Sequence, residues 1–220
     1  MSKHLIILLF ALLLGSLVWS CTNNAKRIKN VELVSNVDTD CTCPHCRILI
    51  QPYDDFSPAK AQEVAKQLEQ SLKKHVPGLA VTEIQVLPNK PLSEYLKNKA
   101  KTRYRASKIL DQQQRLLQQP SDVIIGMTNS DISTTHHGYE DWGILGLSYL
   151  NRNNCVISTF RVKDKSQFWK VVLHEFGHGF LGLDHCPNND RGCFMVDANG
   201  KPKLDKQHHF CDLCSKLIPN

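Results

Sequence analysis

Two histidines and a glutamate in the C-terminal half have the types and spacing of a metal-dependent hydrolase site. Residues 174–178 read HEFGH, so His174 and His178 are four residues apart and Glu175 directly follows the first histidine. On an α-helix this spacing places both imidazoles on one face, about 40° apart in rotation and ~6 Å along the axis. The two rings can bind one zinc ion, beside which Glu175 can take a proton from a zinc-activated water. The motif predicts a zinc site with Glu175 as the general base.

His185 is the candidate for the third zinc ligand. On a continuous helix it would lie ~10 Å along the axis from His178, whereas zinc ligands lie about 2 Å from the metal. The chain must therefore end its helix and fold back between the two histidines. Gly182 is the predicted break, because glycine tolerates the positive φ of a helix C-terminal turn.

The stretch is one residue longer than the extended zinc motif H-E-x-x-H-x-x-G-x-x-H, whose glycine and third histidine would fall at 181 and 184. One added helical residue rotates the exit of the helix by ~100° and advances it by ~1.5 Å. We expect a π-bulge or a wider C-terminal turn between His178 and Gly182 to absorb it, with Gly179 supplying local freedom.

Four cysteines follow the zinc motif and form a second candidate metal site. The chain holds nine cysteines, and those after the motif are Cys186, Cys193, Cys211 and Cys214. A CxxC pair with two further cysteines about twenty residues upstream is typical of a four-thiolate structural zinc site. Two disulfides are the alternative. The zinc site is favoured, because CxxC is a strained choice for a structural disulfide and a common half-site for a metal.

Together these motifs resemble the archaemetzincins, metallopeptidases of the metzincin clan. The resemblance rests on HEFGH, on Cys186 directly after His185, on Cys193-Phe194-Met195 and on the terminal CxxC, and it spans residues 47–217. It implies a metzincin-like α+β fold with a mixed twisted sheet and helices packed on it. It also implies two zinc ions, one catalytic and one structural. The catalytic ligands would be His174, His178 and His185, the structural ligands Cys186, Cys193, Cys211 and Cys214, and Met195 the methionine of the turn beneath the catalytic site.

The chain departs from the family pattern at three points besides its export signal. The step from His178 to Gly182 is one residue longer, six residues separate Cys186 from Cys193 where four are typical, and Phe194 separates Cys193 from Met195. The first departure affects whether the third histidine, His185, points toward the other two zinc ligands. The other two fall in loops that can lengthen.

The N-terminus has the pattern of an export signal. Lys3 and His4 precede a run of about 15 apolar residues that ends near Cys21. Leu17-Val18-Trp19-Ser20-Cys21 resembles a bacterial lipobox, so residues 1–20 are interpreted as a signal peptide and Cys21 as a lipidated cysteine. A retained membrane anchor and ordinary cleavage are the alternatives. Residues 21–46 are then a polar tether with a cysteine cluster, 47–217 the catalytic domain and 218–220 a tail.

Helices and strands must position these residues. We expect strands at 47–53, 80–87, 123–127, 142–148 and 155–160, and a loop at 128–139. We expect helices from Ser57-Pro58 to His75, from Thr102 to about Gln118, and from about Ser166 through the zinc motif. The basic run 97–105, within a chain of net charge +6, is interpreted as a solvated helical face. Alternation of strands and helices favours a mixed sheet with helices on it.

A separate motif, CPHC at 43–46, is known from thiol oxidases, but no strand precedes it here. Cys41, Cys43 and Cys46, with Cys155 as a further candidate, are expected to form disulfides, or a small metal site with His45. The pairs His136-His137 and His208-His209 are expected to be exposed loop residues.

The sequence predicts an exported zinc metallopeptidase, anchored by lipid in the bacterial cell envelope, that hydrolyses peptide or protein substrates and does not bind nucleic acid. A catalytically inactive zinc-scaffold binding protein and a thiol-disulfide oxidoreductase remain the alternatives.

Overall fold

Two β-sheets organise the part of the chain that the computed structural model describes, which is residues 45–198, 200–201 and 203–218. The larger sheet has the strand order β2-β1-β4-β8-β7, in which β7 runs antiparallel to β8 and the other neighbours are parallel. Its strands are β1 (His45–Pro52), β2 (Ala80–Val86), β4 (Asp122–Thr128), β7 (Gly146–Ser148) and β8 (Asn154–Ser158). Within the described residues, β2 and β7 are its edges.

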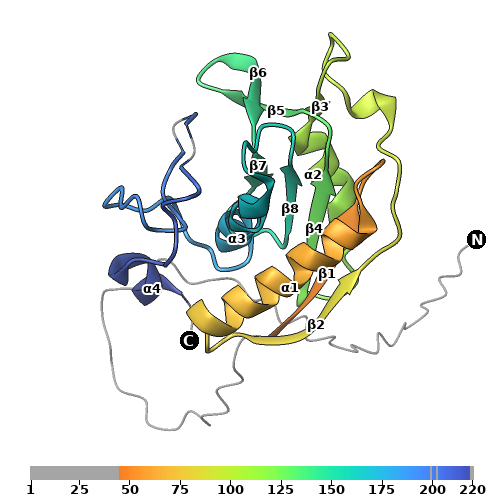
Figure 1. Ribbon diagram of the computed structural model, residues 1–220. Coiled ribbons are helices and arrows are strands. Elements are labelled where there is room, and N and C mark those ends of the chain that lie inside the picture. The colour runs from red at the N-terminus through yellow and green to blue at the C-terminus, as the bar shows by residue number, and fades with distance from the viewer. Residues whose placement is uncertain (1–44, 199, 202, 219–220) are drawn as a thin grey trace, which may run out of the picture. The chain divides into compact units, whose positions relative to one another are not determined.

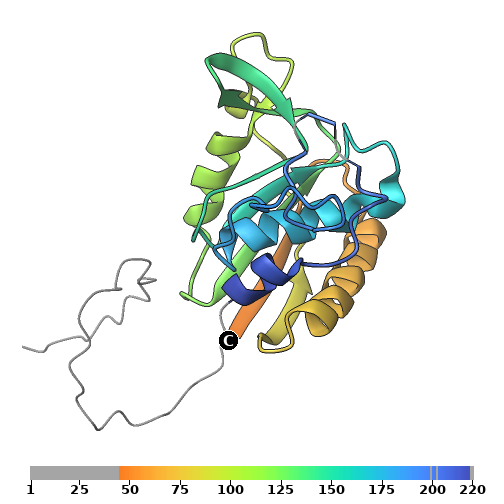
Figure 2. The same cartoon turned by 90° about the vertical axis from the view of Figure 1, so that its left-hand side faces the viewer.

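Helices cover both faces of this sheet, as Figure 1 and Figure 2 show from two sides. α1 (Pro58–His75) and α3 (Phe168–Gly179) pack on one face, where Leu68 and Leu173 join a core with Ile157 of β8. α2 (Ala106–Gln114) packs on the other face, where Ile109 meets Val156 of β8. β4 is buried along its whole length, as expected of a parallel strand covered on both sides. The predicted α+β architecture is confirmed.

The first helix begins and ends where its sequence signals indicate. Ser57 is the N-cap, its hydroxyl accepts the Lys60 N–H at 3.3 Å, and Pro58 opens the helix. The Ser57 hydroxyl pairs with one of the backbone N–H groups of the first turn that have no partner within the helix, and Pro58 has no N–H to be paired. The predicted strands at 47–53, 80–87 and 123–127 are also confirmed within a residue or two.

A smaller sheet corrects two predictions. Its strands are β3 (Tyr104–Arg105), β5 (Ile132–His136) and β6 (Tyr139–Ile144), in the order β3-β5-β6. The loop predicted at 128–139 is therefore wrong, because β5 lies within it. The helix predicted at 102–118 is shorter, because residues 104–105 pair with β5 before α2 begins. The basic run 97–105 is not helical; it follows the 3-10 turn η1 (Glu94–Leu96).

The strand predicted at 142–148 is divided at Leu145. Its first part is β6 in the small sheet, and its second part is β7 at the edge of the large sheet. A continuous apolar run carries no signal for such a change of sheet, which depends on the two different partners, β5 and β8. The division places β7 directly beside α3 (Figure 1).

The zinc-motif helix starts close to the predicted position. A 3-10 turn, η2 (Lys165–Gln167), precedes α3, and the Asp164 carboxylate accepts the Ser166 N–H at 3.0 Å. After α3 the chain follows an irregular path to the short helix α4 (Asp212–Leu217). Among the described residues, no helix combines the length and the apolar character needed to cross a membrane. The signal segment, Cys21 and the polar tether up to residue 44 lie outside the described residues.

Candidate metal centre

The three histidines of the motif converge at the C-terminal end of α3. The Nε2 atoms of His174 and His178 lie 3.0 Å apart, and the ring of His185 lies 5.5 and 4.8 Å from theirs, centroid to centroid. One ligand nitrogen from each residue lies within 4.8 Å of the other two. Nitrogens about 2.1 Å from one tetrahedral zinc are about 3.4 Å apart, so this set is close to the size of a zinc site.

Backbone carbonyls orient the two buried rings. His174 Nδ1 lies 2.8 Å from the Phe194 carbonyl oxygen, and His178 Nδ1 lies 2.6 Å from that of Leu183. A carbonyl only accepts, so each Nδ1 carries the proton and each Nε2 of a neutral ring presents a lone pair. Two lone pairs facing each other at 3.0 Å repel unless a cation lies between them. The arrangement fits a metal ion, because histidines that bind a metal through one ring nitrogen commonly donate the other N–H to a backbone carbonyl, which orients the ring.

Burial favours the neutral, metal-binding form of both rings. It lowers the pKa of His174 to about 3, with the nearby His178 adding to the effect. Burial also lowers the pKa of His178. His185 lies at the exposed side of the group. The triad can therefore accept a cation at neutral pH without first losing protons from the two buried rings.

The extra residue is absorbed in the turn that ends α3. The Leu181 N–H donates to the Phe176 carbonyl five residues back at 3.3 Å, and the Leu183 N–H donates to Gly177 six residues back at 2.9 Å. A Schellman turn closes with a five-residue step, so this turn is one residue wider. Gly182 has φ +65°, which confirms it as the break. The wider turn also points the Leu183 carbonyl at His178 Nδ1. The same turn therefore orients the His178 ring and sets the direction of the chain that leads to His185.

Gly179 has a different role from the one predicted. It lies in regular helix with no positive φ, so it does not supply conformational freedom. A Cβ built there would lie 2.5 Å from the Ser148 hydroxyl and 2.7 Å from the Arg152 carbonyl oxygen. Glycine therefore lets the end of α3 approach β7 and the turn after it.

Glu175 is buried on the side of α3 that faces β7. Burial raises the pKa of its carboxyl to about 8. A Cβ built on Gly146 would lie 2.7 Å from the Glu175 carboxylate oxygen Oε1 and from its Cγ. Backbone of β7 therefore packs directly against the Glu175 side chain. A group with a raised pKa at this position can hold or release a proton near neutral pH, as a general base must.

Met195 packs against α3 at Gly177. Its sulfur would be 2.5 Å from a Cβ at Gly177, so the absent side chain of Gly177 lets the methionine contact the helix backbone. Met195 is fully buried. The preceding residue, Phe194, explains one departure from the family pattern: its ring packs against Trp169 and Phe210, and its carbonyl oxygen holds His174.

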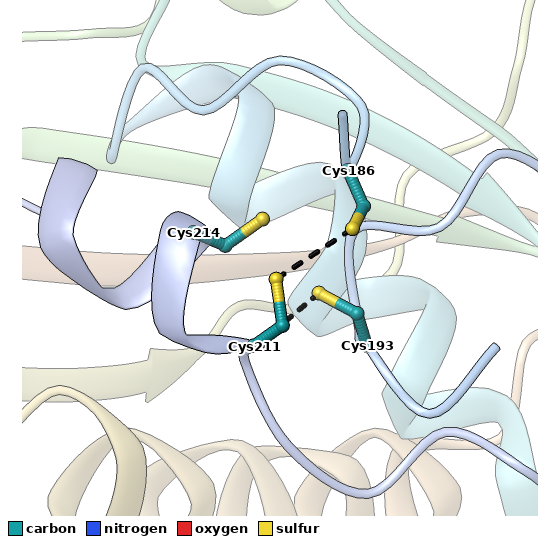
Figure 3. A group of neighbouring side chains, drawn as sticks. All are labelled: Cys186, Cys193, Cys211 and Cys214. Atoms are coloured by element: carbon teal, nitrogen blue, oxygen red, sulfur yellow. Dashed lines mark hydrogen bonds between the residues drawn. The ribbon is translucent and has the colours of Figure 1, made fainter. Parts of the chain in front are cut away.

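The four C-terminal cysteines form one buried cluster, with their sulfurs directed toward one another (Figure 3). The Sγ atoms of Cys186 and Cys211 lie 3.6 Å apart, and all four are free thiols. A disulfide needs about 2.05 Å, whereas two thiolates on one tetrahedral zinc lie about 3.8 Å apart. The two-disulfide alternative is therefore wrong. The Cys211 and Met195 N–H groups donate to Cys193 Sγ, each at 3.4 Å, which suits a thiolate.

The remaining cysteine predictions are corrected where the structure describes them. Cys46 and Cys155 are buried free thiols on β1 and β8, not disulfides. Burial raises the pKa of Cys46 to about 12, the opposite of the depressed pKa of a reactive redox thiol. Cys41 and Cys43 lie outside the described residues.

The paired histidines are only partly as predicted. His136, His137 and His208 are exposed as predicted, but His136 ends strand β5 and is not in a loop. His209 is half-buried and its Nε2 lies 3.1 Å from an Asp190 carboxylate oxygen. Asp197 was not predicted as part of the site; its negative charge opposes the lowering of the pKa of His174 and His178 that burial causes. Its type and spacing match no motif.

Comparison with known proteins points to one family. No protein-family model matches the chain. An archaemetzincin from Haloquadratum walsbyi is 30% identical over 135 residues, which are 54% of this chain and 73% of that protein. The crystal structure of archaemetzincin from Archaeoglobus fulgidus, complexed with malonate, is 30% identical with a TM-score of 0.59 and covers 78% of this chain and 99% of that one. Archaemetzincin from Methanopyrus kandleri, at 23% identity and a TM-score of 0.63, covers 79% and 93% and shares the fold.

Proposed function

The chain belongs to the archaemetzincin family, and from this premise we propose that it is a zinc-dependent metallopeptidase. The observation that carries the proposal is the convergence of three imidazoles beside a buried carboxyl on one helix and its C-terminal turn. Three protein ligands leave a fourth position open, which is the pattern of catalytic rather than structural zinc. His174, His178 and His185 would hold the ion.

Glu175 would act first as base and then as acid. Bound zinc would supply a Lewis acid for the peptide carbonyl and a water of lowered pKa. The Glu175 carboxylate would accept the proton of the attacking water and pass it to the leaving amine. Its burial against Gly146 keeps bulk water from the carboxylate, so the proton remains available for that transfer. An adjacent cation favours the ionised form, so zinc binding would bring the pKa of Glu175 down from about 8.

Strand β7 offers a place for the peptide backbone. It is an edge of the larger sheet among the described residues and passes Glu175 at Gly146. An extended peptide can add to such an edge through main-chain hydrogen bonds. This supports a peptide or protein substrate whose scissile carbonyl would lie between the edge of β7 and the histidines.

A second, structural zinc at Cys186, Cys193, Cys211 and Cys214 is part of the proposal. The cluster joins the segment after the third histidine to the start of α4, and the Cys186 N–H donates to the Met195 carbonyl at 2.7 Å. Four thiolates would close the coordination shell, so this ion would have no open position for catalysis. Its role would be to secure the segment that holds Met195 and Phe194.

Zinc content and peptide cleavage test these assignments together. We expect two zinc ions per chain by elemental analysis, and one after His174→Ala or Cys211→Ser. Glu175→Gln should keep both ions and lose peptide hydrolysis by roughly 10²–10⁴-fold. A wild-type protein that binds two zinc ions and cleaves no peptide would instead support the inactive-scaffold alternative. Cleavage that survives Glu175→Gln would refute the role of Glu175.

We also propose export and lipid attachment at Cys21, supported by the basic, apolar and lipobox-like pattern of residues 3–21. Metabolic labelling of growing cells with a fatty-acid analogue tests it. The protein should be labelled, and Cys21→Ala should abolish the label.

A further inference from the structure

An exposed group of rings stands on the β5–β6 hairpin and has no role in the proposed chemistry. The rings of His136 and Trp142 are 5.7 Å apart and those of Tyr139 and Trp142 are 6.1 Å apart, centroid to centroid. Tyr139 is 66% exposed and Trp142 is 42% exposed. These three residues are called the aromatic platform below. Large aromatic rings left partly in water at adjacent positions are a common feature of binding surfaces.

Ion pairs hold the strand that carries the platform. Arg105 contacts the Asp141 carboxylate at 3.1 Å, and Arg103 donates to the Asp141 carbonyl at 2.7 Å. The Arg161 guanidinium lies so close to Gly143 that a Cβ there would meet it at 2.3 Å. Contacts on either side of Trp142 therefore fix β6. A platform held in this way loses little conformational entropy when a ligand binds.

Two separate chain segments connect Trp142 to the candidate metal centre. Along β6 and β7, Gly146 follows Trp142 by four residues and packs against Glu175. At the rise of an extended strand, the Cα atoms of Trp142 and Gly146 can be at most ~13 Å apart. A Cβ at Gly177 of α3 would lie 2.5 Å from the Met195 sulfur, and five residues further along the chain a Cβ at Gly200 would lie 3.8 Å from the Trp142 ring. The platform therefore adjoins the site rather than a remote face.

The charges around the platform favour an apolar ligand over a cationic one. The Asp141 carboxylate is paired with Arg105, and Glu140 lies 3.8 Å from the Lys99 ammonium group. The Asp141 carboxylate thus already has a basic partner, and the exposed Glu140–Lys99 pair adds little net charge beside the rings. What the hairpin offers beyond them is ring surface, which binds apolar and aromatic side chains by burial and stacking.

We propose that the aromatic platform is a substrate subsite that binds an apolar or aromatic side chain of the peptide within about four residues of the scissile bond. This inference rests on the proposed peptidase function, because the scissile bond is placed at Glu175 and the histidines. The upper limit of about four residues follows from the ~13 Å limit and a rise of about 3.3 Å per residue of an extended peptide. Trp142 is the central residue, since it contacts both other rings and the Gly200 segment.

Peptide binding can be measured without turnover. In a Glu175→Gln background, zinc-loaded protein is titrated into fluorescently labelled twelve-residue peptides, with Phe, Leu, Lys or Ala at each position in turn. Products of the wild-type protein, identified by mass spectrometry, locate the scissile bond. The variants are Trp142→Ala, Trp142→Phe and the matched control Tyr95→Ala. Tyr95 is 63% exposed, but it stands on η1 and contacts Gln112 of α2.

We expect Trp142→Ala to weaken binding of peptides with Phe or Leu at one distal position by about tenfold. Binding of the all-Ala peptide should not change, Trp142→Phe should restore most of the loss, and Tyr95→Ala should have no effect. A uniform loss across all peptides, a preference for Lys, or no selectivity would overturn the subsite. Selective binding without any wild-type cleavage products would leave the subsite standing and refute the peptidase function instead. Absence of peptide binding together with absence of wild-type cleavage products would refute both, and absence of binding alone would refute the subsite.

Discussion

Gly146→Ala tests whether the backbone of β7 positions Glu175. The added methyl would lie 2.7 Å from both Oε1 and Cγ of Glu175 and 2.9 Å from Cδ. Ordinary carbon contacts are about 3.5–4.0 Å, so the carboxylate or the strand must move by roughly 1 Å. A misplacement of this size at a reacting group can cost about 10²-fold in rate. We therefore expect kcat/KM for peptide hydrolysis to fall by roughly 10²-fold, with both zinc ions retained.

Gly143→Ala is the matched control. It lies three residues earlier, and its methyl would meet the Arg161 guanidinium, which Asp131 holds by two hydrogen bonds, so this variant crowds the same chain segment without touching Glu175. It should keep much more activity than Gly146→Ala. A second control shortens the opposing side chain: Glu175→Asp removes one methylene, so the double variant Gly146→Ala, Glu175→Asp should lose less than the product of the two single losses.

Three results would refute the reasoning about Gly146. The first is a Gly146→Ala protein with wild-type kcat/KM. The second is a loss of activity that matches a loss of zinc or a lower melting temperature, since that would be a general disruption. The third is strict additivity in the double-mutant cycle, because two residues that do not touch produce independent effects.

Three further predictions concern other parts of the structure. Gly182→Ala should lower the free energy of unfolding, measured in urea, by about 1–2 kcal/mol and weaken zinc binding at the three histidines. Alanine is strained at φ +65°, and its methyl would lie 2.5 Å from Asn151 Oδ1. Unchanged stability would contradict the turn geometry. Cys211→Ser should remove one zinc ion, lower the melting temperature and leave the three-histidine site occupied; loss of both ions would show that the sites do not form independently. The Arg47 guanidinium lies 2.9 Å from a carboxylate oxygen of the buried Asp122, and its hydrogen bond lowers the pKa of that carboxyl below 3.8, so the pair stabilises the fold above pH 3.8 and this stability is lost as the pH falls through the lower pKa of the folded state. Arg47→Met should therefore reduce the dependence of the free energy of unfolding on pH in the acid range, measured by urea unfolding. An unchanged dependence would contradict the assignment.

Much of the candidate site could be predicted because its signals are local. HEFGH spans little more than one helical turn, so its spacing alone places His174, Glu175 and His178. Gly182 was recognisable as the break because glycine adopts a positive φ with the least strain of any residue type. The boundaries of α1 followed in the same way from Ser57-Pro58 at its start.

Other predictions failed where the outcome depended on distant partners. β5 lies in a stretch of polar residues that indicates a loop, and it became a strand only because β3 and β6 pair with it. Residues 142–148 read as one strand, and only their different partners, β5 and β8, divide them between two sheets. Strand propensity depends on neighbours more than helix propensity does, and these neighbours are far away in the chain.

Residue type and helical spacing were enough to identify the candidate zinc ligands and the candidate base, because both are local properties of the chain. Their surroundings became visible only in the folded protein: the Phe194 carbonyl on His174, the backbone of Gly146 against Glu175, and Trp142 beside Gly200. Each of these contacts joins segments that are 20 to 58 residues apart in the chain. Their approach depends on how the sheets and α3 pack, and no spacing within one element contains that information.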